Sequence, residues 1–300
     1  MPSVVSSTSC VSLRSNTKWV PNPEIGNQKG KKLTTKNFPA TRYNSGTPEE
    51  VRDTLTVEAG LQIKVNGVPF TTTMRTPGAD HELVRGFLFT ESIITDPDAP
   101  IVYRDVIDPK TEHIVAVKIE IDESFIEKPI EGRRTDLTTS SCGLCGTREL
   151  KELQLFGEKL PVDPEKILKS DLLPQMMEQM RQKQGAFNAS GGCHGSAAFD
   201  YSGKLLTVYE DIGRHNAVDK VIGSLLQQKR LEEVHAITVS GRISYEIIYK
   251  AFKAGIPIVA AVSAPSSMAV EIADMFGMTV IGFCRGERAT VYSQPERVRP

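Results

Sequence analysis

The sequence has 300 residues, of which 39% are hydrophobic and 24% charged, proportions that are typical of a folded globular protein. They exclude a wholly disordered chain, and the longest apolar run, residues 256–262, is much shorter than the roughly 20 residues that cross a bilayer. The formal net charge of −1 argues against binding to nucleic acid through bulk positive charge. Five cysteines are too few for a disulfide scaffold.

Residues 1–46 differ from the rest of the chain in charge. They carry about +6, whereas the other 254 residues carry −7. They are also rich in serine and threonine and show no apolar periodicity, so we predict a disordered tail over residues 1–46. An organellar transit peptide is the alternative, because such peptides are basic, rich in serine and poor in acids. The segment lacks the apolar core of a secretory signal, and we expect a cytoplasmic protein with no membrane partner.

Residues 47–137 predict a smaller, mainly antiparallel β subdomain. Apolar and polar residues alternate with the period of a half-buried strand, and Asn66-Gly67 is a strong hairpin turn. Leu83, Phe87 and Leu88 lie on one face of an expected helix. The expected elements are strands at residues 55–57, 61–65, 68–74, 101–107 and 113–121 and a helix at residues 79–92.

Residues 138–300 predict an α/β domain, which makes the chain α+β overall. A polar loop is expected over residues 131–145, followed by helices at residues 148–155, 164–169 and 172–184. Strands then alternate with helices of 10–12 residues, a rhythm that predicts βα units and a largely parallel sheet. The expected strands are residues 204–209, 234–239, 256–262 and 279–283, and the expected helices are residues 216–227, 244–254 and 267–276.

Small, polar loops follow all four strands of this second half. Ligands bind open α/β sheets at the carboxyl ends of the strands, where backbone N–H groups, helix N-termini and arginines together suit phosphate. We therefore predict a site for a nucleotide-like anion, with Arg214, Arg242, Arg285 and Arg288 as phosphate ligands. No Walker or Gly-x-Gly-x-x-Gly sequence is present, which argues against an ATPase or a dinucleotide dehydrogenase. The loops are residues 210–216, 240–242, 263–267 and 284–288.

The pair Cys142-Gly-Leu-Cys145 is the sharpest local feature. It precedes an expected helix, whose N-terminus would stabilise the nucleophilic thiolate. Such a pair could carry sulfur as a persulfide or cycle through a disulfide, although a disulfide oxidoreductase lacks its thioredoxin-like context here. The alternative is a structural zinc site completed by Cys193 and His194, as in a zinc-stabilised chaperone that binds a cofactor without transferring sulfur.

Two histidines are candidate site residues. His194 follows two glycines, so we expect it on a tight, exposed turn where its ring could act as an acid or base or bind a ligand. His215 lies in the first polar loop, where it could do the same or cap the following helix. The other three histidines have no such context, and a structural role is expected for them.

Five motifs in this order resemble the formate dehydrogenase accessory sulfurtransferase family, FdhD. The most specific is the run Glu210-Asp-Ile-Gly-Arg-His-Asn-Ala-Val-Asp-Lys220, and the resemblance covers about residues 55–298. The others are Thr139-Ser-Ser-Cys-Gly-Leu-Cys-Gly146, Gly191-Gly-Cys-His194, Ser240-Gly-Arg242 and Phe283-Cys-Arg-Gly-Glu-Arg288.

The resemblance implies a function and a fold. It implies that the protein accepts sulfur from an L-cysteine desulfurase as a persulfide and passes it to the molybdenum bis-pterin guanine dinucleotide cofactor before that cofactor enters formate dehydrogenase. The cofactor, for which GDP is a mimic, would be a bound substrate, and no permanent metal is expected. The resemblance further implies that the back half is a mixed sheet like that of the cytidine deaminase fold, with βα units, and that the protein is a homodimer.

The same resemblance assigns roles to residues. Cys142 would carry the persulfide and Cys145 would assist it. The residues expected to bind the cofactor are His194, Gly213, Arg214, His215, Asn216, Ser240, Gly241, Arg242, Phe283, Cys284, Arg285, Gly286, Glu287 and Arg288.

Overall fold

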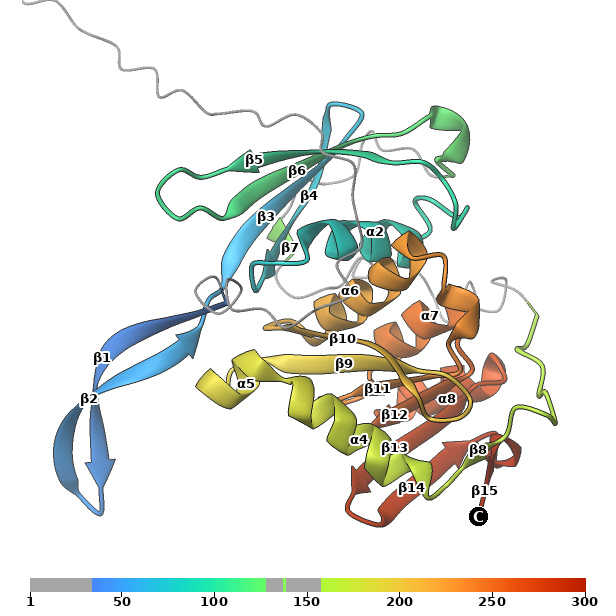
Figure 1. Cartoon of the computed structure of the whole chain (residues 1–300). Helices are drawn as coiled ribbons and strands as arrows, with labels where there is room; N and C mark the ends of the chain where they lie inside the picture. Colours follow the sequence, from blue (N-terminus) through green and yellow to red (C-terminus); the bar gives the residue numbers. More distant parts are fainter. Residues whose placement is uncertain (1–33, 128–136, 139–157) are drawn as a thin grey trace, which may run out of the picture.

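The computed structural model describes residues 34–127, the backbone of residues 137–138, and residues 158–300 (Figure 1). A small sheet with helix α2 beneath it lies above a larger sheet that has helices on both faces. A two-stranded hairpin, β1–β2, extends away from both. No helix in these parts of the chain is long and apolar enough to cross a membrane.

The front half is a five-stranded sheet in the order β5-β6-β3-β4-β7. The predicted strands at residues 61–65, 68–74, 101–107 and 113–121 are confirmed, whereas residues 55–56 end a strand of the separate hairpin. The sheet is mixed, because β3 pairs in parallel with β6 and β4 pairs in parallel with β7. The chain leaves β4 through α2 and returns on the other side of β3, and such a crossover allows parallel pairing. The elements are β3 (Ala59–Val65), β4 (Val68–Arg75), α2 (Asp80–Thr90), β5 (Val102–Ile107), β6 (Ile114–Glu120), the 3₁₀ turn η1 (Glu123–Phe125) and β7 (Leu137–Thr138).

The predicted turn at Asn66-Gly67 joins β3 and β4. Both residues have positive φ, 49° and 84°, which is the conformation of a type I′ hairpin turn. The Asn66 amide also donates to the Ile121 carbonyl at 2.9 Å and accepts from the Ile121 N–H at 3.0 Å. One asparagine therefore forms the turn and holds the end of β6 beside it.

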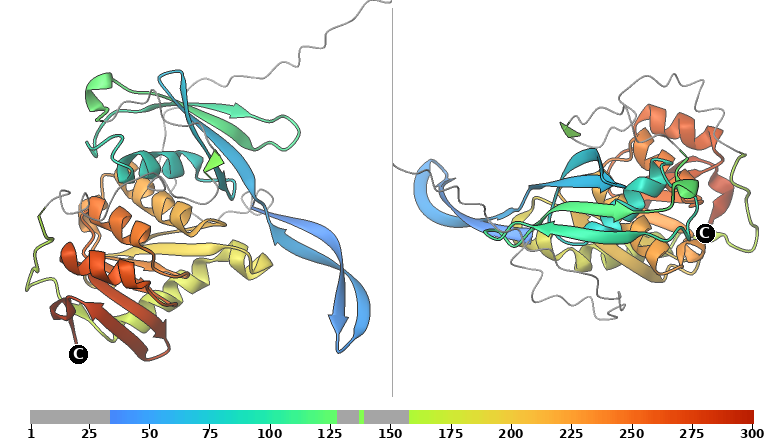
Figure 2. Two further views of the ribbon diagram at one scale, coloured as in Figure 1. Left: turned by 180° about the vertical axis from the view of Figure 1, so that it is seen from behind. Right: turned by 90° about the horizontal axis from the view of Figure 1, so that it is seen from above.

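The prediction of a disordered tail to residue 46 is wrong for its last part. Residues Thr35–Asn44 form β1, which pairs along its whole length with β2 (Thr47–Thr56). Both views in Figure 2 show this hairpin projecting from the body. Its residues are polar and mostly exposed, so no apolar pattern marked β1, and cross-strand pairing specifies it instead. Residues 1–33 lie outside the described part of the chain.

The back half is a six-stranded sheet in the order β10-β9-β11-β12-β13-β14. Only β11–β12 and β12–β13 pair in parallel, so the mixed sheet that the resemblance implies is confirmed, whereas the largely parallel sheet that the βα rhythm indicated is not found. Each predicted strand and helix after residue 204 is present. They are β10 (Leu205–Asp211), α6 (Arg214–Gln227), β11 (Ala236–Val239), α7 (Tyr245–Lys253), β12 (Ile258–Ala261), α8 (Ser267–Met275) and β13 (Thr279–Arg285).

Several back-half elements were not predicted. Strand β9 is built from small residues of low β propensity, yet it lies mid-sheet and is buried from Gly195 to Phe199. The expected helix at residues 164–169 is instead a turn leading into β8, which pairs with β15 near the C-terminus. The expected helix at residues 172–184 is confirmed as α4. The remaining elements are α4 (Leu172–Lys183), α5 (Gly185–Ser190), β8 (Leu168–Lys169), β9 (His194–Phe199), β14 (Arg288–Ser293), β15 (Val298–Arg299) and the 3₁₀ turns η2 (Leu231–Glu233) and η3 (Pro295–Arg297).

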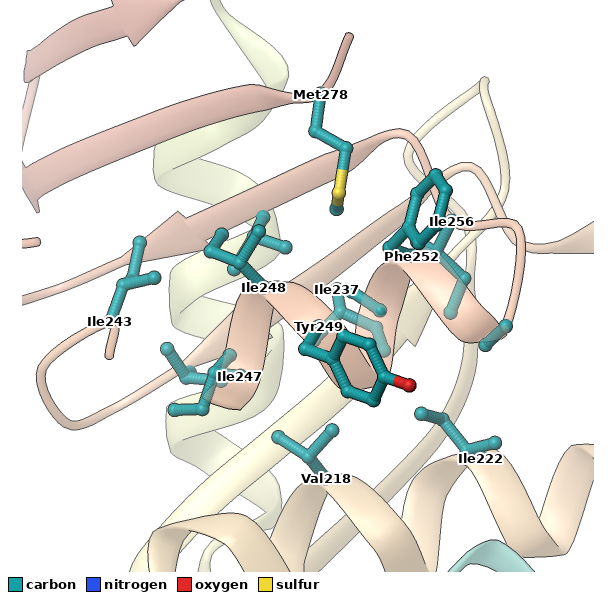
Figure 3. Close-up of a cluster of buried hydrophobic side chains, with 14 of the residues drawn as sticks. Val218, Ile222, Ile237, Ile243, Ile247, Ile248, Tyr249, Phe252, Ile256 and Met278 are labelled. Atoms are coloured by element: carbon teal, nitrogen blue, oxygen red, sulfur yellow. The ribbon is translucent and has the colours of Figure 1, made fainter. Parts of the chain in front are cut away.

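Side chains alternate across the larger sheet with the period of two residues that strands impose. In β12, Val259 and Ala261 pack toward α6, α7 and α8, whereas Ile258 and Ala260 pack toward α4. Figure 3 shows the first of these cores, where Val218 and Ile222 of α6 meet the isoleucines of α7. Burial on both faces makes this sheet the rigid frame on which its strand-end loops are held.

Helices α2 and α6 cross at two glycines. A Cβ at Gly86 would lie 1.9 Å from the Asp219 carbonyl oxygen, and a Cβ at Gly223 would lie 1.8 Å from the Glu82 carbonyl oxygen. No real Cβ approaches backbone this closely, so the crossing requires glycine at both positions. This contact joins the front half to the back half.

We expect Gly223→Ala to lower the free energy of unfolding by about 1–3 kcal/mol or more, because the methyl group must push two helix backbones apart. Urea unfolding measures this change. Gly185→Ala is the matched control, since nothing lies within 4 Å of its Cβ position. Equal stability of the two variants would show that the helices separate without cost.

Candidate functional site

A cavity of about 590 Å³ lies at the carboxyl-terminal edge of the parallel strands. Ser240 directly follows β11, Val262 directly follows β12, and Arg285 ends β13, and all three line the cavity. Helices α4 and α5 supply the facing wall. The volume and the position are those of a typical small-molecule site in an α/β sheet.

The cavity wall is mostly apolar with a few polar groups. Such a lining suits a ligand that combines a flat or apolar part with groups that form hydrogen bonds. The apolar residues include Pro174, Met177, Met180, Phe187 and Val262. The polar side chains are Glu178, Arg181, Gln184, His194, Ser240 and Arg285.

A bulge in β13 brings Cys284 and Arg285 to the cavity together. Successive residues of a regular strand face opposite sides, but both of these line the same cavity. The register shifts between Gly282 and Arg285, and Phe283 has a φ of 55°, which is rare for a residue with a side chain. Strain at Phe283 therefore accompanies the placement of its two successors at the cavity.

The hairpin turn after β13 forms the rim of the cavity. Gly286 has a φ of 56°, as the first position of a two-residue turn between β13 and β14 commonly requires. The Arg285 Nε donates to the Val262 carbonyl at 3.0 Å, which anchors the side chain. Among the described residues, no hydrogen bond to the two terminal nitrogens of this guanidinium is found, so they can meet a ligand.

The structure divides the residues predicted to bind the cofactor into three groups. His194, Ser240, Cys284, Arg285 and Gly286 line the cavity. A Cβ at Gly241 would lie 3.1 Å from the His194 Nδ1 and 3.6 Å from the Arg214 Cδ. Gly241 therefore lies next to the lining residue His194, and Arg214 lies next to Gly241. The predicted residues that neither line the cavity nor contact its lining through Gly241 are Gly213, His215, Asn216, Arg242, Phe283, Glu287 and Arg288.

His194 begins β9 and is half-buried, whereas the sequence predicted an exposed turn. Burial lowers the pKa of its imidazole below the usual value, and the Arg214 charge lowers it further. The ring is therefore neutral at pH 7 and can both donate and accept a hydrogen bond in the cavity.

The run from Glu210 to Lys220 mostly joins the two halves instead of lining the cavity. The Asp211 carboxylate accepts from the Thr76 N–H at 3.1 Å and contacts the Lys220 Nζ at 2.8 Å. The Asn216 amide donates to the Met74 carbonyl at 2.8 Å. The most specific motif of the sequence thus holds β10 and α6 against the end of β4.

Glu210 supports the cavity indirectly. Its carboxylate oxygens accept from the N–H groups of Ala186 and Phe187 at 2.8 and 2.7 Å, so Glu210 caps the first turn of α5. Phe187 and the glycines that follow α5 line the cavity. Glu210 is therefore a positioning residue for this wall.

His215 is 3% exposed and does not line the cavity. Its Nε2 is 3.0 Å from the Ser244 Oγ and 3.8 Å from a Glu246 carboxylate oxygen. Burial lowers its pKa to about 3, and the charges of Arg214 and Lys250 act in the same direction. The imidazole is neutral and connects α6 to the start of α7.

Cys142 and Cys145 lie outside the described residues, and so does the predicted helix at residues 148–155. Of the predicted loop around the cysteines, only the backbone of residues 137–138, which form β7, is described. Within the described ranges, no group of three or more potential ligands could hold a metal ion. The zinc hypothesis stays a prediction, because two of its four ligands are the undescribed cysteines. Its third ligand, Cys193, is 4% exposed and within hydrogen-bond distance of the Thr56 hydroxyl, 3.4 Å away.

Burial raises the pKa of both thiols that line the cavity. The pKa of Cys284 rises to about 11, and that of Cys193 also lies above its usual value. Both are free cysteines that stay protonated at neutral pH, and thiols are much weaker nucleophiles than thiolates. The sequence interpretation of Cys284 as a buried thiol is confirmed.

Sequence reasoning did not identify the α4–α5 wall. The residues it missed include Met177, Glu178, Met180, Arg181, Gln184 and Phe187. The apolar period of α4 indicated only a helix with a buried face, and nothing local distinguishes a face that lines a cavity from one that packs in a core. The fold alone brings this helix opposite the strand ends.

Comparisons with known proteins agree with this fold and with the sequence motifs. The model of the FdhD/NarQ family matches residues 56–299. The chain belongs to the FdhD/NarQ family. The match covers both halves and leaves out the β1–β2 hairpin except for Thr56, the last residue of β2.

Curated relatives of this FdhD/NarQ chain carry the name sulfur carrier protein FdhD. The protein from Sulfolobus acidocaldarius is 42% identical over 261 residues, which cover 86% of this chain and 96% of the relative. The protein from Mycobacterium tuberculosis is 40% identical over 256 residues, which cover 82% and 92%. A crystal structure described as that of a formate dehydrogenase accessory protein from Desulfotalea psychrophila has a TM-score of 0.69 at 22% identity, covering 89% of this chain and all of that one. That likeness supports the fold.

We expect the stability of the protein to fall as the pH drops from 7 to 5, partly through His215. The unfolded chain binds a proton there below pH 6.5, whereas the folded chain binds one only near pH 3. Because the unfolded state then holds more protons, the free energy of unfolding falls by about 2 kcal/mol over this range. His215→Gln should remove that part of the slope in urea unfolding at each pH. An unchanged slope would show that His215 titrates normally when folded.

Proposed function

We propose that this protein is a sulfur carrier that accepts persulfide sulfur from an L-cysteine desulfurase and transfers it to the molybdenum bis-pterin guanine dinucleotide cofactor before formate dehydrogenase receives it. The cavity at the ends of β11, β12 and β13 is the observation that carries the proposal. It combines an apolar wall, neutral hydrogen-bonding groups and the arginine-glycine turn at Arg285, which together suit a nucleotide end of that cofactor.

The names of the relatives support the sulfur step, and the sequence supplies two thiols for it. The Cys142 thiolate would attack the outer sulfur of the donor persulfide. This step would form a Cys142 persulfide and release the desulfurase cysteine as a thiolate. The Cys145 thiolate could then attack the inner sulfur of that persulfide. This step would release hydrosulfide to the acceptor and form a Cys142–Cys145 disulfide, which a thiol reductant would reduce for the next cycle.

The chemistry of the described thiols also supports this assignment. Cys193 and Cys284 are buried with raised pKa values, so neither is suited to attack a persulfide.

The proposed partners of the protein are the desulfurase, formate dehydrogenase and a second copy of the chain, all in the cytoplasm. Size-exclusion chromatography with light scattering tests the homodimer.

We expect the parent protein to gain the mass of one sulfur atom after incubation with a cysteine desulfurase and L-cysteine, and to lose it on reduction. Intact-protein mass spectrometry measures this gain. Cys142→Ala should show no gain while still binding GDP, and Cys10→Ala should behave like the parent. A full gain on Cys142→Ala would assign the carrier to another cysteine, and no gain on a folded parent that binds GDP would remove the sulfur-carrier proposal.

We expect Arg285→Ala to weaken GDP binding by about tenfold or more, because one charge-assisted hydrogen bond contributes roughly 1.5–3 kcal/mol. Calorimetric titration measures the Kd. Arg288→Ala is the matched control, since Arg288 follows the same turn but is not a lining residue. Equal losses in both variants would show that the charge of the turn acts at long range and not through contact.

A further inference from the structure

The β1–β2 hairpin is a ribbon of two strands that has little contact with the rest of the described chain. Its strands pair over ten residues each, and α5 contacts its base. Beyond the base it projects from the body, as both views in Figure 2 show. A ribbon of two strands is only marginally stable in water unless one of its faces packs against another surface. The hairpin therefore has a face that is available to another molecule.

The two faces of the hairpin differ in character, because alternate residues of a strand point to opposite faces. One face is polar, and on it the Thr54 hydroxyl donates to the Asn37 amide oxygen at 2.8 Å. Thr56 lies on the same face, and its Oγ1 is 2.6 Å from the Ser190 Oγ of α5. The polar face is therefore the one that meets the body, and the opposite face points away from α5.

The opposite face has an apolar centre made of Phe38, Ala40, Val51 and Leu55. In the register of the hairpin, Ala40 is directly across from Val51, and Phe38 is diagonal to both Val51 and Leu55. Side chains at such positions contact one another and form a continuous surface. Phe38 is 41% exposed and Leu55 is 45% exposed. Apolar side chains that gather on one exposed face indicate a surface that binds another protein.

Charged residues of both signs border this apolar centre. Lys36 and Arg42 stand on β1, and Asp53 and Glu49 stand on β2, all on the face that carries Phe38. Among the residues that the structure describes, none of these four side chains takes part in an ion pair. Because both cations of the face lie on one strand and both anions on the other, the face is complementary in charge to a copy of itself.

We propose that the β1–β2 hairpin is a dimerisation arm whose apolar face packs against the same face of a second copy, with β1 of one chain over β2 of the other. This proposal rests on the homodimer of the proposed function and names its contact surface. A two-fold axis that runs along the ribbons relates the copies, and it places Arg42 over Glu49 of the partner subunit and Lys36 within reach of Asp53 of the partner subunit. Turning one ribbon end for end would instead place cations opposite cations.

The arrangement also places the two bodies at the same end of the ribbons. At 3.3 Å per residue and 4.8 Å between strands, each ribbon face covers only roughly 330 Å², whereas a stable interface buries about 1,200 Å² or more in total. The bodies would therefore lie side by side and supply the rest of the contact. Because each ribbon is a small part of a modest interface, the loss of one pair of contacts should have a measurable effect on the dimer.

Single charge reversals test this arrangement. Arg42→Glu and Glu49→Arg each place like charges across the proposed interface, so each variant alone should have the mass of one chain, 33.0 kDa, at a concentration where the parent has twice that mass. Mixed in equal amounts, the two variants should recover the dimer mass, because an acidic face then meets a basic one. Size-exclusion chromatography with light scattering measures the masses. Mixing does not repair a hairpin that fails to form, so this rescue separates contact between copies from folding of the hairpin.

Phe38→Ser tests the apolar centre and should raise the Kd of the dimer by about tenfold or more, because the phenyl ring loses its buried contact. Tyr43→Ser is the matched control, since Tyr43 is an aromatic residue of the same strand that is 70% exposed on the polar face. It should leave the Kd unchanged. A dilution series of the full chain measures both values.

Four outcomes would overturn the proposal. A parent with the mass of one chain at every concentration would show that the hairpin does not join two copies, and its binding to the desulfurase or formate dehydrogenase through Phe38 would give the hairpin a different partner. A dimer that survives Phe38→Ser and both charge reversals would place the interface elsewhere, and a mixture that stays monomeric would remove the pairing of β1 with β2. The sulfur gain of Cys142 and the binding of GDP are measured separately, so a failure of the proposed sulfur transfer is a distinguishable result.

Discussion

The buried ion pair between Lys220 and Asp211 holds the two halves of the protein together. Both side chains are at most 2% exposed, and burying a charge costs several kcal/mol unless it is neutralised and fully hydrogen-bonded. The Lys220 Nζ meets that requirement with the Asp211 carboxylate and with the carbonyls of Thr76 and Glu210, at 2.9 and 3.3 Å. Because Thr76 follows the front sheet and Asp211 ends β10, the pair fixes where β10 stops and α6 starts. The neighbouring Glu210 then caps α5, so the position of the cavity wall also depends on this ion pair.

Residues that join the two halves and residues that line the cavity thus come from different parts of the chain. The run from residue 210 to residue 220 provides the framework, with Gly223 and Gly86 allowing α6 to approach α2 closely. The groups that reach the cavity come from the ends of β11, β12 and β13 and from α4 and α5. These cavity-lining residues lie on loops, strand ends and helices that this frame holds in place, a common arrangement in α/β proteins.

The cavity also retains features that a purely structural site would lack. Phe283 has a backbone conformation that is unfavourable for its residue type, and Gln184 buries an amide nitrogen without a partner. Both cost stability, and such costs concentrate where a protein binds ligands. The thiols in the same wall have raised pKa values and stay protonated at neutral pH, which agrees with the proposal that Cys142 and Cys145 carry the sulfur.

The sequence by itself determined the local elements and several of the cavity residues. The apolar periods gave every predicted strand and the helices α2, α4, α6, α7 and α8, because buried faces impose those periods directly. Ser240 and Arg285 were predicted because ligands bind open α/β sheets at the carboxyl ends of the strands, and His194 was predicted because two glycines precede it. Tertiary structure alone decided the rest. Strands β1 and β9 exist because their neighbours pair with them, His215 and Asn216 are buried supports because α6 packs under the front half, and α4 brings Gln184 to the strand ends. Contacts between residues far apart in sequence determine these features, and no local pattern of residue types records such contacts.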